Sequence, residues 1–186
     1  MSFEQTARRL RLPLGFLFAA LYLAFGPRPT SPLTLAVGGA VALVGLAIRA
    51  WAAGHIVKND RLATTGPYAH TRNPLYFGSF LIAAGFAIAA HWSLLLVVVA
   101  FFVLVYGPTI EKERVKISAR FPDEYARWEQ NVPAFVPRPT PWRDPMVVET
   151  ERFSPSLYMR HGEWRAGLGF ILALAWLVLR MKGFPR

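Results

Sequence analysis

Two long stretches of this chain contain no acidic residue, and they limit the folds open to it more than any other feature. The first covers residues 5–59 and the second covers residues 61–110. The whole chain is 54% hydrophobic and only 17% charged, with a mean hydropathy of +0.31. Long apolar runs with so few charges are what the hydrocarbon core of a bilayer requires. The sequence therefore predicts an all-α, polytopic membrane protein in which lipid is the main solvent.

Apolar segments of helical length occur five times, which predicts a transmembrane bundle of about five helices forming one membrane domain over residues 1–186. The first segment, ~14 residues long, is short for a full span at ~1.5 Å of rise per residue. It resembles a signal peptide, but Pro27-Arg28-Pro29 stands where a cleavage site with small residues is expected, so we predict a retained helix. The predicted spans are residues 12–25, 33–53, 75–90, 94–108 and 166–179.

Small residues in the second span predict a close helix contact. Gly38, Gly39 and Gly45 lie among several alanines, and small side chains allow membrane helices to approach closely. Arg49 and Trp51 are expected to mark the interfacial end of this span.

Three residues, His91-Trp92-Ser93, are all that separates the third span from the fourth. So short a connection predicts a tight antiparallel hairpin. Asn73 before the hairpin and Glu111 and Glu113 after it are then expected at the same membrane face.

Basic residues cluster at that face, which the positive-inside rule assigns to the cytoplasm. The last span, in the C-terminal part at 165–181, would carry Arg180, Lys182 and Arg186 to the opposite face, against the rule. Either this helix is short, re-entrant or interfacial, or its charges are too few to reverse the orientation. Residues 139–164 are polar and contain prolines, and we expect an irregular cytoplasmic connection that serves as a lid.

Several functional classes are disfavoured by composition. The chain has no cysteine, which excludes disulfides and thiolate ligands, and its four histidines, His55, His70, His91 and His161, show no metal-ligand spacing. We expect no metal. The net charge of +10 fits anionic lipid headgroups better than nucleic acid, because the arginines lie beside apolar segments.

The segment TTGPYAHTRNPLYFG, residues 64–78, places turn-forming and polar residues directly before an apolar helix. Pro74 suits the first helical position and disfavours helical geometry at Asn73, which becomes the expected N-cap. The free amides of that helix would face Tyr68, His70 and Arg72. This arrangement predicts an anion site beside lipid.

The pattern G-P-Y-x-x-x-R-[HN]-P-x-Y-x-G, a hydrophobic hairpin and a downstream F-x-x-x-Y-x-x-[YW]-x-x-x-V-P-x-F-x-P resemble the isoprenylcysteine carboxyl methyltransferase and phospholipid methyltransferase family. The resemblance covers residues 62–138, and its second half consists of Phe121, Tyr125, Trp128, Val132, Pro133, Phe135 and Pro137. It implies an integral membrane methyltransferase that uses S-adenosylmethionine in a cytoplasmic pocket. The methyl acceptor would be lipidic or hydrophobic, either a carboxylate of the prenylcysteine type or a phospholipid amine.

The resemblance also implies roles for individual residues. The expected catalytic residues are Arg72, Asn73 and Glu113. The expected cofactor-binding residues are Gly66, Pro67, Tyr68, His70, Arg72, Asn73, Pro74, Tyr76 and Glu113. Expected contacts to the substrate come from Glu111, Tyr125 and Trp128.

The chain departs from the family pattern at two positions. Asn73 stands where many relatives have histidine, which excludes an obligatory imidazole base there. The paired glutamates of relatives align with Glu113 and Arg114, which leaves Glu111 one position outside the pair and off the helical face of Glu113.

Two other functions stay open at this stage. One is a nicotinamide-dependent membrane reductase of related fold, and the other is a non-catalytic membrane partner, which Arg114 in place of a second glutamate keeps open. The resemblance implies a bacterial-type inner membrane with the site facing the cytoplasm. The acceptor and the oligomeric state are not determined by the sequence.

Overall fold

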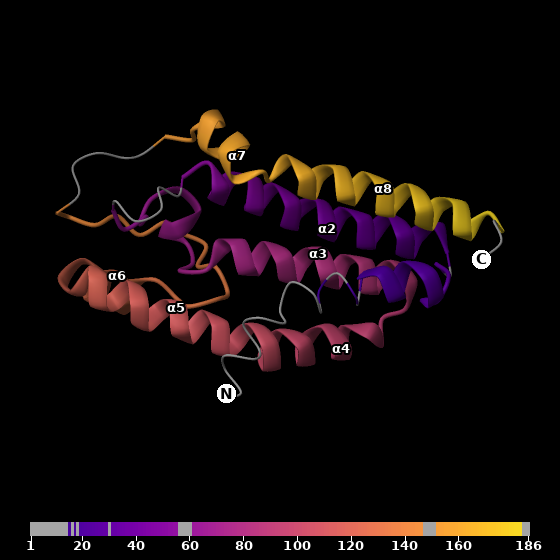
Figure 1. Ribbon diagram of the computed structural model, residues 1–186, viewed down its shortest axis with the longest axis horizontal. Coiled ribbons are helices and arrows are strands. Elements are labelled where there is room, and N and C mark those ends of the chain that lie inside the picture. The colour runs from indigo at the N-terminus through magenta and orange to yellow at the C-terminus, as the bar shows by residue number, and fades with distance from the viewer. Residues whose placement is uncertain are drawn as a thin grey trace.

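The computed structural model describes residues 15, 17, 19–29, 31–55, 61–146 and 152–183. This part of the chain is helical and contains no strand, which confirms the predicted all-α class. Figure 1 shows the long helices lying side by side along the long axis of the molecule. The elements are α2 (Pro32–Ala53), η1 (Gly66–Ala69), α3 (Pro74–Ala90), α4 (Leu94–Phe101), η2 (Phe102–Tyr106), α5 (Gly107–Arg120), α6 (Pro122–Asn131), α7 (Pro155–His161) and α8 (Trp164–Met181).

Three helices of the described chain are long and apolar enough to cross a membrane: Pro32–Ala53, Leu94–Arg120 and Trp164–Met181. The helix Pro74–Ala90 is also apolar but shorter, at 17 residues. Residues 19–25 of the predicted first span are helical, whereas residues 12–14, 16 and 18 lie outside the described residues.

The helix that contains the predicted fourth span does not end at residue 108, because α4, η2 and α5 form one helix that continues to Arg120. Proline normally ends or kinks a helix, since it lacks an amide and its ring meets the carbonyl four residues back. Here the turn before Pro108 is a π-helix, in which the amide of Gly107 donates to the carbonyl of Phe102. The wider turn accommodates the proline without stopping the helix.

Glycines bring the backbones of α2 and α3 into direct contact. A Cβ at Gly45 would lie 2.5 Å from the carbonyl oxygen of Gly78, and a Cβ at Gly38 would meet the carbonyl oxygen of Gly85. These contacts are reciprocal, so neither helix tolerates a side chain there. The predicted small-residue face is confirmed at Gly38 and Gly45, while Gly39 faces Leu174 of α8 instead.

The hairpin of α3 and α4 turns at His91, whose amide donates to the carbonyl of Ala87 at 2.8 Å. In Figure 1 the start of α3 and the end of α5 lie at the same end of the bundle, where η1 and α6 also lie. A hydrogen bond of 2.8 Å from Tyr76 to Glu113 joins the two arms there. The predicted meeting of the two ends of the hairpin is therefore confirmed.

The terminal helix α8 begins at the same end and runs back along α2 (Figure 1). Its 18 residues are enough to cross a membrane, so it is not the short element that the charge pattern allowed. Arg180, which the positive-inside rule did not explain, is 1% exposed. Its guanidinium donates to the carbonyls of Leu23 at 3.2 Å and Gly26 at 2.9 Å. The charge therefore caps the end of the first helix.

The connection before α8 is more ordered than predicted. It contains the short helix α7, where Ser154 accepts a hydrogen bond from the amide of Leu157 and Gly162 ends the helix with a φ of +70°. Residues 147–151 lie outside the described residues. His161 donates from Nδ1 to the carbonyl of Ala53, 3.0 Å away, which fixes α7 to the end of α2.

We predict that Gly85→Ala destabilises the protein by about 1–3 kcal/mol, because the added methyl must push apart two backbones in contact. Gly169→Ala is the matched control, since a Cβ at Gly169 in α8 meets nothing within 4 Å. Thermal unfolding in detergent measures both. Equal midpoints for the two variants would contradict the role of the glycine contact.

Candidate functional site

The two halves of the sequence motif are held together by backbone hydrogen bonds. The amide of Arg72 donates to the carbonyl of Pro133 at 2.9 Å, and the amide of Trp142 donates to the carbonyl of Ala69 at 2.9 Å. Thr71, which is 1% exposed, donates its hydroxyl to the carbonyl of Phe135 at 2.9 Å. Residues 69–73 thus form one unit with residues 133–142.

Arg72 lies inside this unit and is largely buried, with 13% of its side chain exposed. Its Nη1 donates to the hydroxyl of Tyr125 at 3.0 Å and also binds the carboxylate of Glu129. Its buried Nε has no hydrogen-bond partner among the described residues. Because a buried donor without a partner costs free energy, this nitrogen is suited to an acceptor on a ligand.

Asn73 occupies the N-cap position and Pro74 the first position of α3, as predicted. The side chain of Asn73 does not cap the helix, however. It donates from Nδ2 to the carbonyl of Ala134 at 2.8 Å, which adds another bond between the two motif halves. The geometry gives Asn73 a structural contact in place of the expected cap.

Glu113 and Glu111 point to different surroundings, as their spacing on the helix predicts. Glu113 accepts the hydrogen bond from Tyr76. Glu111 instead binds Arg114 through both carboxylate oxygens, at 2.7 to 2.9 Å, and its side chain is 61% exposed. Arg114 also lies 3.7 Å from Glu129. Glu113 is therefore the carboxylate that faces α3.

The π-helix η2 supplies an aromatic wall next to Glu113. Tyr106 stacks on Phe102 with ring centroids 4.4 Å apart, and it meets Tyr76 edge to face at 5.4 Å. Tyr106 was not predicted as a site residue. The adjoining Gly107-Pro108 was the available signal, since a proline within an apolar helix often marks a local widening.

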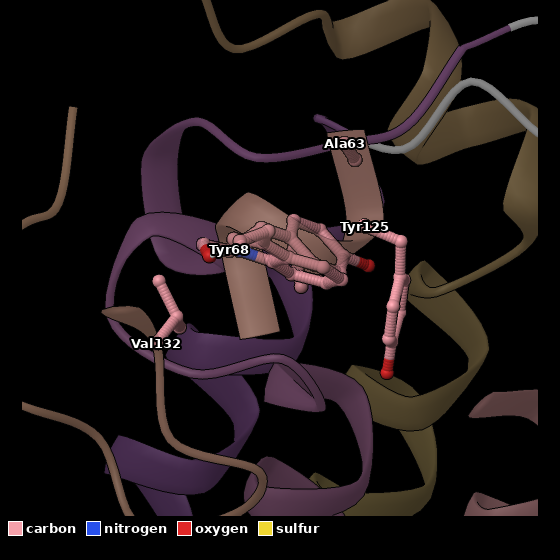
Figure 2. Packing of buried hydrophobic residues seen from close by; sticks show 6 residues of the cluster. Ala63, Tyr68, Tyr125 and Val132 are labelled. Carbon is pink, nitrogen blue, oxygen red and sulfur yellow. Dashed lines mark hydrogen bonds between the residues drawn. The ribbon is translucent and has the colours of Figure 1, made fainter. Parts of the chain in front are cut away.

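Tyr68 lies in the core cluster beside Tyr125 and Val132 (Figure 2). It is 5% exposed, and its hydroxyl has no hydrogen-bond partner among the described residues. Burial raises the pKa of Tyr68, and the negative charges of Glu163 and Glu113 add to this effect. Burial also raises the pKa of Tyr125, against the opposing hydrogen bond from Arg72. Both tyrosines are therefore neutral hydrogen-bonding groups near pH 7.

Trp128 has a structural contact within the same cluster. Its indole nitrogen donates to the carbonyl of Tyr68 at 2.9 Å, and its side chain is 3% exposed. Trp128 therefore supports the turn from behind, whereas the hydroxyl of Tyr125 reaches Arg72.

A buried ion pair that the sequence did not predict borders Tyr68. Arg49 of α2 binds Glu163 before α8 through two nitrogens, with the shortest contact at 2.7 Å, and the two side chains are 23% and 13% exposed. Arg49 also donates to Ser79 and to the carbonyl of Leu75 in α3. A single arginine near the end of an apolar span was the available signal, because such charges rarely lie in a membrane segment without a partner. Glu129 was missed as well, although it lies one helical turn after Tyr125.

The remaining predicted cofactor-binding residues, Gly66, Pro67 and His70, lie in or next to the turn η1 and do not all face the same site. Gly66 and His70 line a separate cavity with Trp51 and Asp144. Gly66 has a φ of +57°, and a Cβ there would lie 2.5 Å from the ring of His55, so both conformation and space require glycine. Pro67 is buried at the start of the turn. The structure thus places Tyr68 near Tyr76 and Glu113. Arg72 contacts Tyr125, which packs in the same cluster as Tyr68, while Gly66 and His70 line the separate cavity.

Within the described ranges, no group of three or more histidine, aspartate or glutamate side chains is arranged to hold a metal ion. Ion pairs join Arg49 to Glu163, Arg72 to Glu129 and Arg114 to Glu111.

The fold and this cluster define a class: an all-helical protein with membrane-length helices and a polar site at one end of the bundle. Residues 34–118 match the model of the phospholipid methyltransferase family. The chain is 30% identical to the nickel-cobalt-cadmium resistance protein NccN of Alcaligenes xylosoxydans xylosoxydans, over 80% of this chain and 70% of the relative. It is also 30% identical to the cobalt-zinc-cadmium resistance protein CzcN of Cupriavidus metallidurans, over 76% of this chain and 67% of the relative.

The chain therefore belongs to the phospholipid methyltransferase family, as its motifs predicted. No solved structure matches it significantly. Membership indicates a membrane methyltransferase as the general class.

We predict that Tyr68→Phe leaves the ligand-free protein as stable as the original or up to about 2 kcal/mol more stable, because it removes a buried hydroxyl without a partner. Thermal unfolding at pH 7 and pH 11 measures this. The pKa of Tyr68 is raised in the folded protein. The stability that this shift contributes is therefore complete below the pKa of an unfolded tyrosine, ~10, and is lost as the pH rises towards the pKa of Tyr68 in the folded protein. The variant should therefore lose less stability at pH 11. A clear destabilisation at pH 7 would show that the hydroxyl has a structural partner.

We predict that Glu163→Gln or Arg49→Met destabilises the protein by about 2 kcal/mol, because each leaves a charge largely buried without its partner. The double variant should lose less than the sum of the two single variants. A double-variant cycle of unfolding midpoints tests the coupling. Simple additivity would mean that the pair does not hold α2 and α8 together.

Proposed function

We propose that the protein transfers the methyl group of S-adenosylmethionine to a lipidic or hydrophobic acceptor. Family membership supports the reaction class. One observation supports this site in particular: a guanidinium nitrogen of Arg72 and the hydroxyl of Tyr68 are buried without partners among the described residues, in a cluster that also holds Glu113.

The polar groups of this cluster fit the chemistry of the cofactor. S-adenosylmethionine carries a carboxylate, an ammonium group and a sulfonium, and so it needs both a cationic and an anionic partner. The free Nε of Arg72 suits the carboxylate, and the carboxylate of Glu113 suits the ammonium. The ring faces of Tyr76 and Tyr106 suit the sulfonium, since aromatic faces attract cations.

When bound, the cofactor supplies a methyl group that its positive sulfur already activates. The protein then has to position the cofactor and the acceptor and to exclude water. These two effects account for much of the acceleration in such reactions. Glu129 and Tyr125 fix the Nη1 side of Arg72 and so orient its Nε. Tyr76 orients the carboxylate of Glu113 in the same way.

The acceptor is proposed to arrive from the lipid side. The helix of α4 and η2 presents exposed apolar side chains over much of its surface, including Leu96, Val103 and Leu104. An acceptor that is a carboxylate needs no base, whereas a phospholipid amine must lose a proton. We propose Glu113 as the base in that case, because it aligns with a glutamate of the family motif. We place the site at the cytoplasmic face of the inner membrane on the basis of the clustered basic residues.

We predict that the purified protein binds S-adenosylmethionine and S-adenosylhomocysteine in isothermal titration. Arg72→Ala and Glu113→Gln should each weaken binding about tenfold or more, because each removes a charge-assisted hydrogen bond. Asn73→Asp should also weaken it, by placing a negative charge beside the carboxylate. Glu124→Gln on the exposed face of α6 is the control and should bind as the original protein does.

Protein shown to be folded that binds neither ligand would contradict the proposal. Binding of reduced nicotinamide dinucleotide in its place would favour a reductase. Unchanged affinity in all three site variants would remove the assignment of the site while keeping the cofactor.

A further inference from the structure

Two consecutive residues of α5 reach opposite sides of the proposed cofactor site. Glu113 accepts the hydrogen bond from Tyr76 of α3. Arg114 instead faces α6, where its Nη1 lies 3.7 Å from a carboxylate oxygen of Glu129. The same carboxylate oxygen binds Nη1 of Arg72. Two arginines from different elements therefore share one carboxylate, which links Arg114 to the guanidinium that we propose for the carboxylate of the cofactor.

The surroundings of Arg72 contain a carboxylate that an incoming anion must tolerate. The side chain of Arg72 is 13% exposed and that of Glu129 is 36% exposed. The Nε of Arg72 is buried and has no hydrogen-bond partner among the described residues. A ligand carboxylate at this nitrogen would lie close to Glu129, because both would bind the same guanidinium, and like charges at such a distance repel each other. Glu129 therefore orients Arg72 but also opposes the anion that Nε is suited to bind.

Arg114 supplies a second positive charge that offsets Glu129. Its Nε and Nη2 bind Glu111 at 2.7 to 2.9 Å, which leaves Nη1 directed at Glu129. Glu111 thus holds the guanidinium in place beside α6. The side chain of Arg114 is 38% exposed, so water and salt weaken its field without abolishing it. A positive charge at this position makes Arg72 more attractive to an anion than Glu129 alone would allow.

We propose that Arg114 is a positioning residue that acts through Glu129 and makes the site prefer ligands that carry a carboxylate. It balances the charge of Glu129, so that the guanidinium of Arg72 keeps its attraction for the ligand. The proposal rests on the proposed function, since it takes the site to bind S-adenosylmethionine. The departure from the family pattern at position 114 then compensates for Glu129 and is no sign of a lost activity.

The test is isothermal titration of the full chain in detergent at low ionic strength with two probes. One is S-adenosylhomocysteine, and the other is its decarboxylated analogue, which keeps the amine and lacks only the carboxylate. The measured quantity is the ratio of the two dissociation constants. A variant that merely loosens the site weakens both probes and leaves this ratio unchanged. We expect the original protein to prefer S-adenosylhomocysteine about tenfold or more, because the carboxylate adds a charge-assisted hydrogen bond.

Arg114→Gln should lower this preference about threefold, which is the size expected for a partly exposed charge. The loss should shrink at high salt, because salt screens exposed charges. Arg114→Lys keeps the charge and should keep most of the preference. Lys116→Gln is the matched control, since it removes a positive charge from an exposed position of the same helix, and it should leave the preference unchanged.

Glu111→Gln tests the same charge balance in the opposite direction. It removes the carboxylate that competes with Glu129 for Arg114, and it should raise the preference for S-adenosylhomocysteine about twofold. A purely structural role of the contact between Glu111 and Arg114 predicts no such increase. This variant decides the matter if Arg114→Gln does not fold.

The proposal fails by itself if the original protein prefers S-adenosylhomocysteine but Arg114→Gln shows the same preference as Lys116→Gln. It also fails by itself if Glu111→Gln lowers the preference, or if Arg114→Lys loses as much of it as Arg114→Gln does. If the folded original protein binds neither probe, the proposed function fails together with this inference.

Discussion

The direct contact between the backbones of α2 and α3 is the constraint on which the polar end of the molecule depends. Gly45 and Gly78 meet without side chains, and this closeness lets Arg49 of α2 lie along α3 and reach Ser79 and the carbonyl of Leu75. A Cβ at Gly78 would lie 2.7 Å from Cγ of Arg49. The glycines therefore set the position of the Arg49–Glu163 pair and, through Glu163, the start of α8.

Charge pairing then organises what packing brings together. Arg49 joins Glu163, Arg72 joins Glu129, and Glu111 joins Arg114. Arg49, Glu163 and Arg72 are largely buried, where an unpaired charge is costly, whereas the Glu111–Arg114 pair lies at the surface. Glu113 accepts a hydrogen bond from the hydroxyl of Tyr76, which ties this carboxylate to α3.

Much of the fold followed from local sequence rules. Apolar length gave the long helices, the three residues at 91–93 gave the hairpin, and Pro74 gave the start of α3, because each of these depends on neighbours in the chain. The site was predicted less completely. Glu129 and Glu163 reach their partners from 57 and 114 residues away, and no local pattern specifies such pairs. The position of Arg180 violated the positive-inside rule. Its partners are backbone carbonyls, and such partners cannot be inferred from the residue types in a sequence. The roles expected for Arg72, Asn73 and Glu113 stay predictions.

The π-helix at Phe102–Tyr106 also has a meaning for reading related sequences. Such a turn is equivalent to one residue inserted into a regular helix, and one residue changes the direction of everything downstream by ~100°. Glu111 and Glu113 both lie past that insertion. Glu113 faces α3, whereas Glu111 binds Arg114. An ungapped alignment with a relative that lacks the wide turn would therefore pair carboxylates that lie on different faces of the helix. In this chain, the helical face of a residue, counted from Pro108 after the turn, shows which carboxylate contacts α3.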